Sequence, residues 1–399
     1  MDEPSEGISQ VAFSQEMNPT HMVRKRVFHA WLIAFTGCFY PLSAEADFRE
    51  DRVTMVVDAK RDSVLDRMFR TKRGWIGGDS AESISLDRDR ILWLFGDSYL
   101  GREEGGVRRI DGMIRNAVAI QKRKKSGSSS LRFYPDMRHE SPGAFFLPDG
   151  REWVWPCRGG LRTASGLYVF LPKFRTVAGR PDGFGFASAG MIFARIPNPD
   201  ESPDRWHIRY FPVPSSICTK AGRKSFGNPF RGNDGHIYFP GMDELSGGRR
   251  LLMARTSSEN LEDFGSWEFR TSSGWSRRPQ DAVALCDHLG AELSLCWKPA
   301  LGSYLLVNTR DGLSDRIVGR IAPTPWGPWS HGVTLFRAPE ARHDASISCY
   351  AGKEHPELSA GKDEIVISYV CNADPKKVVA SPRLYRPQFV RVRLRAPGP

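Results

Sequence analysis

Short apolar segments separated by turns rich in glycine and proline recur along the chain from about residue 70 to its C-terminal end. Segments of this length with many aromatic and β-branched residues are typical of β-strands, and long amphipathic helical patterns are missing. The segments fall into units with a period of about 50–60 residues, which is typical of propeller blades. The units lie at roughly 70–135, 145–212, 225–270, 285–337 and 345–396. The expected strands include 91–95, 117–121, 166–171, 191–196, 236–239, 251–255, 293–297, 303–308, 317–322, 364–370 and 388–394.

Five units of about four strands each predict an all-β chain that folds as a single-domain, five-bladed β-propeller. A pair of β-sandwiches is the alternative, because it would also show short strands at this spacing. A strand at 52–57 would pair with the last unit and close the ring. We expect the propeller domain to span residues 47–399 of the 399-residue chain, and the basic, serine-rich segment 122–130 to be a solvated loop.

Residues 22–46 have the pattern of a secretory signal peptide. A basic segment at 24–26 precedes an apolar segment at 27–40, and Ala44-Glu45-Ala46 forms a small-x-small cleavage site. The apolar segment is too short for a stable membrane anchor. Met22 is then the expected start, with 1–21 as an upstream extension of the reading frame, and a true N-terminal extension is the alternative. A lipoprotein-type box ends at Cys38, so the protein is expected to be secreted or periplasmic, or anchored to a membrane through an acylated Cys38.

The charge of the chain narrows the range of partners. The formal net charge is +11, and removal of residues 1–46 raises it to +13. An exported basic protein favours anionic surfaces such as cell-wall polymers or acidic glycans, although a soluble surface that is simply basic fits equally well. The export signal and the absence of a recognition motif argue against nucleic acid. We expect a monomer whose partner is an oligo- or polysaccharide.

The cysteines permit disulfides without specifying them. When Cys38 is set aside, six cysteines remain, and six can pair in 15 ways. They are Cys157, Cys218, Cys286, Cys296, Cys349 and Cys371. The chain has no CxxC pair and no Cys/His cluster at zinc spacing, so we expect neither a metal nor a cofactor.

Two aspartates flank a predicted hairpin near the start of the domain. Asp79 follows two glycines, Asp97 follows Gly96, and a turn at 85–90 leads into the strand at 91–95. A hairpin of this shape brings its two ends together, and each end carries a glycine that lets the backbone approach a ligand. The pattern predicts carboxylate chemistry at the end of a strand pair.

In a propeller, the innermost strand of each blade lines a central funnel, so residues at the strand entries converge. The expected entries are 78–79, 156–158, 227–228, 291–292 and 355–357. Glycoside hydrolysis needs one protonated and one ionised carboxyl group, and the candidate catalytic residues are Asp79, Asp97 and Glu292. The candidate substrate-binding residues are Arg158, Asn228, Trp155, Tyr99, His355 and Glu357. Structural roles stay open for Asp97 as a turn cap, for Trp155 and Tyr99 in the core, and for His355 as a hydrogen-bonded histidine.

Several segments resemble the domain-of-unknown-function 4185 group, which is related to the endo-D-arabinanases of glycoside hydrolase family 183. They are 77–99, 291–294, 307–309, 312–318, 322–330, 355–358, 367–369 and 385–389, and the resemblance covers most of residues 70–395. The group is similar in architecture to the five-bladed propellers of families 43 and 32. The resemblance implies that Asp79 and Asp97 hold the carboxylate positions of the first blade and that Glu292 matches a Ser-Glu-Leu/Phe-Ser segment of the fourth.

The second blade departs from that pattern. Relatives tend to carry a Trp-Pro-x-Asp-Gly-like segment, whereas this chain has Trp155-Pro156-Cys157-Arg158-Gly159. Arg158 would then stand in place of a carboxylate, which leaves either the substrate or the activity open and favours an anionic or phosphate-bearing sugar.

The sequence therefore leaves hypotheses from different classes. The first is a secreted glycoside hydrolase that acts on a cell-wall or extracellular polysaccharide of furanoside or arabinan type through paired carboxylates. The alternative is a carbohydrate-binding propeller without catalysis, which Arg158 motivates. A sialidase is a weaker third option, because residues 85–89 lack the glycine of an Asp-box.

Overall fold

The computed structural model describes residues 56–124, 128–135, 142–148, 150, 152–177, 185–219, 223–245 and 248–395. The predicted signal peptide, the upstream extension and Cys38 lie outside these residues. The described chain forms 26 β-strands, with short helices α2 (Ser63–Met68), α3 (Pro339–His343) and α4 (Pro375–Ala380). Within this part of the chain, no helix has the length and apolar character needed to cross a membrane.

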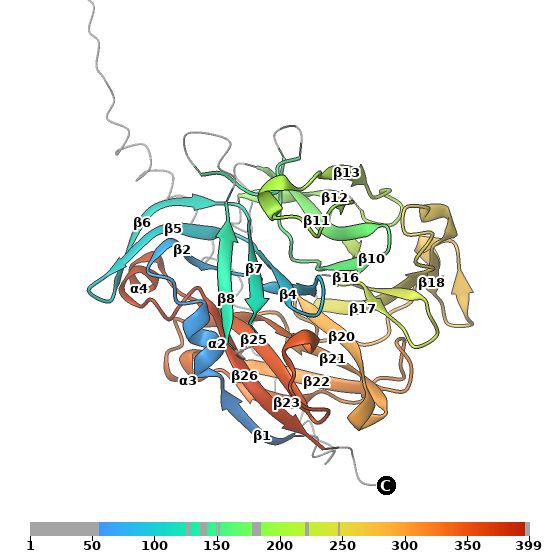
Figure 1. Cartoon of the computed structure of the whole chain (residues 1–399). Coiled ribbons are helices and arrows are strands. Elements are labelled where there is room, and N and C mark those ends of the chain that lie inside the picture. The colour runs from blue at the N-terminus through green and yellow to red at the C-terminus, as the bar shows by residue number, and fades with distance from the viewer. Residues whose placement is uncertain are drawn as a thin grey trace, which may run out of the picture.

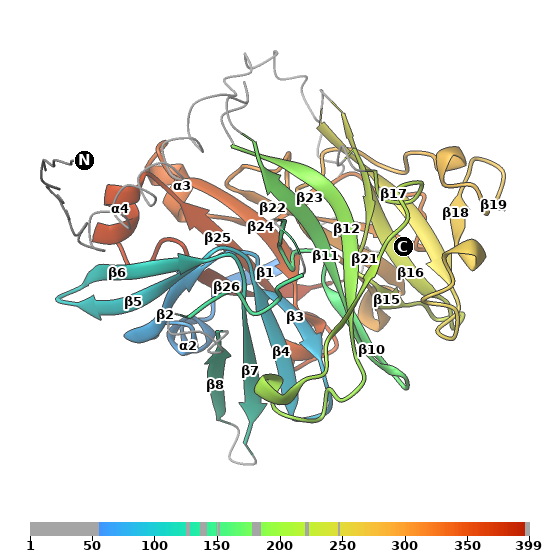
Figure 2. The same ribbon diagram turned by 90° about the horizontal axis from the view of Figure 1, so that it is seen from above.

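The strands form antiparallel sheets, five of which follow one another in chain order (Figures 1 and 2). The first contains β3 (Glu82–Ser85), β4 (Arg90–Phe95), β7 (Ala117–Arg123) and β8 (Ser129–Tyr134). The second contains β10 (Gly160–Thr163), β11 (Gly166–Thr176), β12 (Phe186–Ile196) and β13 (Arg209–Pro212), with β9 (Trp153–Val154) paired to β11. The third contains β14 (Lys224–Phe226), β16 (Ile237–Leu245), β17 (Gly248–Thr256), β18 (Glu268–Arg270) and β19 (Trp275–Ser276), with β15 (Phe230–Arg231) paired to β16.

The fourth sheet contains β20 (Leu293–Lys298), β21 (Ser303–Thr309), β22 (Arg316–Ala322) and β23 (Val333–Arg337). The fifth contains β24 (Ser348–Glu354), β25 (Glu364–Asn372), β26 (Pro387–Leu394) and β1 (Val56–Arg61). A smaller sheet contains β2 (Arg73–Gly78), β5 (Ser98–Glu104) and β6 (Val107–Ile114), and its β5–β6 hairpin projects to one side of the molecule in Figure 2.

Apolar side chains fill the spaces between consecutive sheets. Val118 of the first sheet and Val169 of the second share one buried cluster, and Ile91 of the first sheet and Val366 of the fifth share another. Three further clusters join the second sheet to the third, the third to the fourth and the fourth to the fifth. The middle strands are therefore buried on both faces, because each sheet packs face to face with two others. A ring of sheets packed in this way is a β-propeller, which confirms the predicted all-β, single-domain class.

The closure of the ring joins the two ends of the domain. β1 pairs with β26 over Val56–Arg61, and the blue β1 lies beside the red β26 in Figure 1. The predicted closing strand is confirmed for residues 56–57 and extends four residues further, while 52–55 lie outside the described residues. We call this pairing and the charged side chains around it the seam. Arg61 of β1 donates to Glu340 Oε1 at 2.6 Å, and Arg391 of β26 donates to Asp62 Oδ2 at 2.6 Å.

The predicted hairpin is also confirmed, because β3 pairs with β4 from Glu82 opposite Leu94 to Ser85 opposite Ile91. The small sheet was not foreseen from the sequence. Its strands β2 and β5 pair from Arg73 opposite Arg102 to Gly78 opposite Ser98. The chain passes from β2 to β3 at residues 79–81 and from β4 to β5 at residues 96–97. The two aspartates therefore lie where one strand pair leaves the small sheet and enters the propeller.

Candidate active site

Asp79 and Asp97 lie side by side at this junction. Gly96 donates its backbone N–H to the carbonyl of Asp79 at 3.1 Å. A Cβ atom on Gly96 would lie 2.4 Å from Asp79 Oδ1, so only glycine leaves room for the carboxyl group there. The other end of the hairpin carries a shallow depression lined by the charged side chains of 87–90 and 122–123, and it is remote from these aspartates.

Asp79 is partly buried and receives one hydrogen bond from a tyrosine, Tyr350 Oη, at 3.0 Å. Burial, together with the negative charges of Asp97 and Glu292, raises the pKa of Asp79 well above its ordinary value. The Tyr350 hydrogen bond and the positive charge of Lys353 act in the opposite direction but are smaller. The balance favours a carboxyl group that holds its proton.

Asp97 has a different environment, although it lies next to Asp79. Arg115 Nη1 is 3.1 Å from Asp97 Oδ2, and Trp155 Nε1 donates to Asp97 Oδ1 at 3.1 Å. Burial raises the pKa of Asp97, while Arg115 and Trp155 counteract that rise. Of these two neighbouring carboxyl groups, one faces acids and the other faces a cation. Such a difference moves their pKa values apart, so that one can donate a proton while the other is ionised.

Below these aspartates, the first strands of the sheets bring charged side chains to the axis of the propeller. We call Glu82, Arg158, Asn228, Glu292 and Lys353 the axial cluster. Glu82 and Lys353 belong to β3 and β24, Glu292 directly precedes β20, Arg158 lies two residues before β10, and Asn228 lies between β14 and β15. Lys353 Nζ is 3.1 Å from Glu82 Oε1 and also contacts Glu292 Oε2. Burial raises the pKa of Glu82 to about 7, although Lys353 acts against that rise. Glu292 is thus brought close to Asp79, as predicted, but it is also bound to a lysine that the sequence did not reveal.

Arg158 joins three sheets from inside the ring. Its guanidinium donates to the carbonyl of Ala291 at 2.7 Å and to Ser225 Oγ at 3.1 Å. Its backbone carbonyl accepts from the N–H of Asn228 at 2.6 Å, which places both predicted residues in one contact. Because the guanidinium is buried and bound to protein groups, its position gives no support to the expectation that it selects an anionic sugar.

The backbone around these side chains is strained. Among the described residues other than glycine, seven have positive φ, and five of the seven lie at this site. They are Ser80 (65°), Ala81 (52°), Asn228 (48°), Ala351 (58°) and Tyr385 (53°). Left-handed conformations cost residues with a Cβ atom about 1–3 kcal/mol each and gather at functional sites. The strain therefore marks the same place as the converging acids.

Tyr385 is held in this conformation by buried arginines. Arg108 donates to the carbonyls of Val378 at 2.7 Å and of Leu384 at 2.5 Å, so it fixes the segment that precedes Tyr385. The Tyr385 carbonyl in turn accepts from Gly78 N at 2.9 Å. Tyr99, a predicted substrate-binding residue, is 1 % exposed and packs on the Tyr385 ring at 5.1 Å, so it supports the site from the core.

The prediction that residues 355–357 form the entry of the fifth inner strand is wrong. That strand is β24, and His355 and Glu357 follow its C-terminal end. His355 is fully buried, and its two ring nitrogens lie 2.6 Å from Ser83 Oγ and 2.7 Å from Ser368 Oγ. The sequence of β24 is largely polar and lacks the alternation expected of a strand, which is why Tyr350 and Lys353 were missed.

An aromatic group flanks Asp97. Trp155, the predicted sugar-stacking residue, contacts Trp153 at 4.8 Å and Phe174 at 4.9 Å between ring centroids. Arg115 lies over the Trp153 ring at 4.4 Å. All of these side chains are partly exposed, and half-exposed aromatic rings next to a carboxyl group suit the apolar faces of sugars. The long β11–β12 hairpin that supplies Phe174 extends beyond the strand predicted at 166–171.

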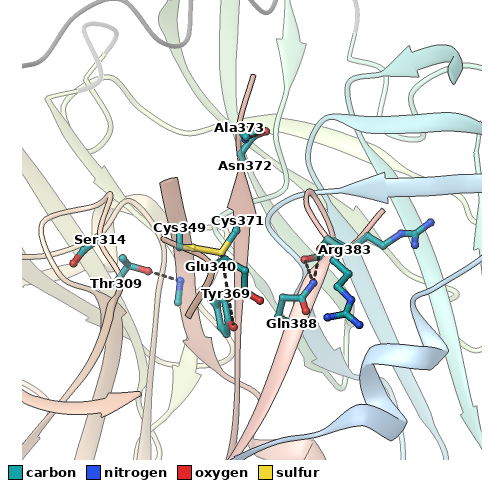
Figure 3. Close-up of a disulfide and its surroundings, with 12 residues drawn as sticks. Thr309, Ser314, Glu340, Cys349, Tyr369, Cys371, Asn372, Ala373, Arg383 and Gln388 are labelled. Atoms are coloured by element: carbon teal, nitrogen blue, oxygen red, sulfur yellow. Dashed lines mark hydrogen bonds between the residues drawn. A yellow bond between two sulfur atoms is a disulfide. The ribbon is translucent and has the colours of Figure 1, made fainter. Parts of the chain in front are cut away.

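A disulfide lies beside the site. Cys349 and Cys371 are opposite each other in β24 and β25 and form a disulfide (Figure 3), whereas Cys157, Cys218, Cys286 and Cys296 are free thiols. The backbone carbonyl of Cys371 accepts from Tyr385 N at 2.7 Å, and Cys349 directly precedes Tyr350. The bridge thus fixes both tyrosines. Its sulfurs and Glu340 are close enough for a metal site in the described residues, but a disulfide offers no thiolate ligand.

One family model matches almost the whole of the described chain. It is described as a domain of unknown function, DUF5005, and it matches residues 62–394. This family is a different one from the domain-of-unknown-function 4185 group that the sequence resembles, so that resemblance stays a prediction. No curated protein matches the sequence.

Solved structures share the fold at low sequence identity. A presumed hydrolase from Bacteroides ovatus has a TM-score of 0.66 and 18 % identity, over 84 % of this chain and 90 % of that one. A thermostable family-43 glycoside hydrolase has a TM-score of 0.43 and 13 % identity, over 82 % and 94 % of the chains. An α-L-arabinofuranosidase from Lactobacillus brevis has a TM-score of 0.44 and 10 % identity, over 79 % and 91 %. At 18 % identity the first likeness speaks for the fold alone.

Proposed function

The chain belongs to the DUF5005 family, a domain of unknown function, and we propose that it is a glycoside hydrolase that acts through Asp79 and Asp97. One observation carries the proposal. The two aspartates lie at the junction before the first inner strand; burial, Asp97 and Glu292 raise the pKa of Asp79 well above its ordinary value, whereas Arg115 and Trp155 counteract the rise in the pKa of Asp97. Paired carboxyls with such a difference are the minimum that glycoside hydrolysis requires.

Each group has a role that its surroundings favour. Asp79 holds its proton because it faces Asp97 and Glu292, so it would donate that proton to the oxygen of the leaving sugar. Asp97, next to the Arg115 guanidinium, would act in its ionised form on the opposite side of the bond or on an attacking water. Glu292 contributes negative charge that keeps the proton on Asp79, and Trp155 would stack on the sugar while it orients Asp97.

We also propose the number of blades, the type of substrate and the location of the protein. The five large sheets are counted as five blades, and the small β2–β5–β6 sheet as an addition to the first. The resemblance to the endo-D-arabinanase-related group supports a furanoside or arabinan-type substrate. The pattern at 22–46 supports export, with anchoring through Cys38 as the alternative, and an exported enzyme of net charge +13 suits a cell-wall or extracellular polysaccharide.

The test is hydrolysis of a panel of arabinans, arabinogalactans, galactans and xylans by the wild type and by Asp79→Asn. We expect sugar release from at least one arabinose-containing polymer, and a loss of about a thousandfold in Asp79→Asn because its amide cannot donate the proton. Asp87→Asn is the matched control, since Asp87 is exposed at the far end of the same hairpin. Equal release by the wild type and Asp79→Asn would refute the site.

A carbohydrate-binding propeller without catalysis is the second candidate. It is favoured by Lys353, which binds Glu292 and Glu82 and so offsets charge that a catalytic site would use. Calorimetric binding of a polysaccharide by wild type and Asp79→Asn with equal affinity, and with no product after prolonged incubation, would establish it in place of the hydrolase.

A further inference from the structure

We propose that Lys353 is the positioning residue of this site, and that its ammonium group holds the turn of Asp79 and the carboxylate of Glu292 in place while it sets the charge around them. The proposal deepens the hydrolase assignment and rests on it for its kinetic consequences. Its structural and electrostatic consequences can be measured without any substrate.

The geometry places Lys353 between three consecutive sheets. It belongs to β24 of the fifth sheet, its side chain is 1 % exposed, and its ammonium lies 3.1 Å from Glu82 in the first sheet. The same ammonium contacts Glu292, which precedes β20 of the fourth sheet, and donates to the backbone carbonyl of Ser80. The ammonium therefore donates hydrogen bonds to the Ser80 carbonyl and to Glu292, and its charge lies against Glu82.

The contact with Ser80 reaches Asp79 directly. Ser80 and Ala81 have consecutive left-handed conformations, which turn the chain so that Asp79 faces Gly96 and Asp97. Two such residues in succession persist only where the surroundings hold them. The ammonium binds the carbonyl between them and so holds this turn together with the backbone hydrogen bonds from Ala81 N and Gly96 N to the Asp79 carbonyl.

The charges that face Lys353 come from every neighbouring element. Acidic groups are Glu82 at the start of β3, Glu292 before β20, and Asp79 at the junction. Arg158 and Cys157 precede β10, Tyr350 lies earlier on β24, and His355 follows the end of that strand in a buried site that disfavours its charged form. Arg158 donates to Ala291 and Ser225, and Arg115 binds Asp97. Lys353 is therefore the cation assigned to the pair Glu82 and Glu292.

The molecule contains its own control in a second buried lysine. Lys298 contacts Glu354, whose side chain is 0 % exposed, and this pair involves one carboxylate and one ammonium. The backbone N–H of Glu354 donates to Ser294 Oγ at 2.7 Å, so it makes no hydrogen bond with the turn of Asp79. Removing Lys298 leaves one unpaired acid away from Asp79, whereas removing Lys353 leaves two acids beside it.

The experiment compares Lys353→Met with Lys298→Met. Carboxyl ¹³C titration of aspartate-labelled protein, with Asp79 assigned by its absence in Asp79→Asn, is the first readout. We expect Lys353→Met to raise the pKa of Asp79 by about one unit, because a nearby positive charge is removed, and Lys298→Met to leave it unchanged. With a substrate, Lys353→Met should lower kcat by about tenfold or more at little change in KM, because it disturbs only the orientation of reacting groups.

The charge-balanced variant Glu82→Gln/Lys353→Met covers the case in which Lys353→Met does not fold. It removes one acid with the lysine, so we expect it to fold and still to show a disturbed Asp79 titration, because the Ser80 contact is lost. An Asp79 titration identical to the wild type in this variant, or an equal shift in Lys298→Met, would overturn the proposal. If the titration shifts but no polysaccharide is cleaved, the role of Lys353 stands and the hydrolase assignment fails.

Discussion

The seam and the axial cluster both bury charged side chains, yet they arrange them differently. At the seam, Arg61 binds Glu340 and Asp66, and Arg391 binds Asp62 and Glu364. Each acid there faces a guanidinium, and the strands keep a regular antiparallel pairing apart from one shift near Val56. In the axial cluster and at the aspartate junction beside it, acids face one another: Asp79 lies near both Asp97 and Glu292. Residues with left-handed backbone also accumulate there.

The difference teaches that buried charge alone does not identify a functional site. At the seam every acid has a guanidinium partner, which suits a structural role in holding two ends of the chain together. Like charges pressed together, and backbone held in costly conformations, work against stability and persist where chemistry requires them.

The largest effect should come from the same substitution made in both regions. Asp97→Asn should reduce turnover about a hundredfold or more while the free energy of unfolding changes little, because the group is partly exposed and its neighbour Asp79 is relieved of a negative charge. Asp66→Asn at the seam should lower the free energy of unfolding and change turnover little, since Asp66 accepts hydrogen bonds from Phe389 N and Arg61. Turnover per folded molecule measures the effect on catalysis, and urea unfolding measures the effect on the free energy of unfolding. A seam variant that loses turnover as strongly as Asp97→Asn would remove the contrast.

The disulfide lies close to Glu340 and Tyr369 (Figure 3), and Cys349 directly precedes Tyr350 of the site. Cys349→Ala/Cys371→Ala should lower the free energy of unfolding by about 3 kcal/mol, because a bridge over a separation of 22 residues no longer restricts the unfolded chain. Cys218→Ala, a buried free thiol, is the control for lost packing. Denaturant unfolding with and without reductant measures the effect, and a double variant as stable as the control would contradict it.

The axial cluster should also impose a pH dependence on stability through Glu82. The unfolded chain releases the Glu82 proton near its ordinary pKa of 4.5, whereas the folded protein holds it to about 7. Glu82 therefore favours the fold fully below pH 4.5, and that contribution is lost as the pH rises to about 7, by on the order of 2 kcal/mol.

The measurement is the difference between wild type and Glu82→Gln in unfolding free energy from pH 4 to pH 8. Taking the difference removes the opposite contribution of His355, whose pKa is lowered by burial and whose stabilising effect is lost as the pH falls. A difference that does not change over this range would show that Glu82 titrates normally.

The smallest effect concerns backbone strain. Ala81→Gly should stabilise the protein or leave it unchanged, by up to about 1 kcal/mol, because glycine adopts a φ of 52° without cost. Ala119→Gly in the regular strand β7 should destabilise it by about 1 kcal/mol, because glycine loses more conformational freedom on folding. Thermal unfolding measures both changes in stability. A gain or no change for Ala81→Gly with a loss for Ala119→Gly would support backbone strain at Ala81, and equal losses of stability at both positions would argue against it.

The sequence predicted the parts of the molecule that depend on local patterns. Apolar segments such as 293–297 and 364–370 became strands at nearly the expected positions, and the hairpin between Asp79 and Asp97 formed as expected and brought its two ends together. The small sheet was missed because β2 is rich in glycine and β5 and β6 are charged.

The site depended on partners that no local pattern reveals. Lys353 and Tyr350 come from a polar strand that lies more than 250 residues from Asp79, and only closure of the ring brings them together. Arg158 was expected to face a ligand, but a buried guanidinium takes the carbonyl and hydroxyl acceptors that the neighbouring sheets supply. Pairing across the axis is a property of the assembled ring and not of any single unit.

The pH dependence of kcat/KM on the best substrate of the panel tests the central claim most directly. The account predicts that hydrolysis declines along a basic limb with an apparent pKa well above the ordinary aspartate value, because Asp79 must hold its proton in order to donate it. Asp79→Asn should lose this limb together with nearly all turnover. A wild-type rate that stays constant from pH 4 to pH 9, or a basic limb that Asp79→Asn retains, would contradict the account.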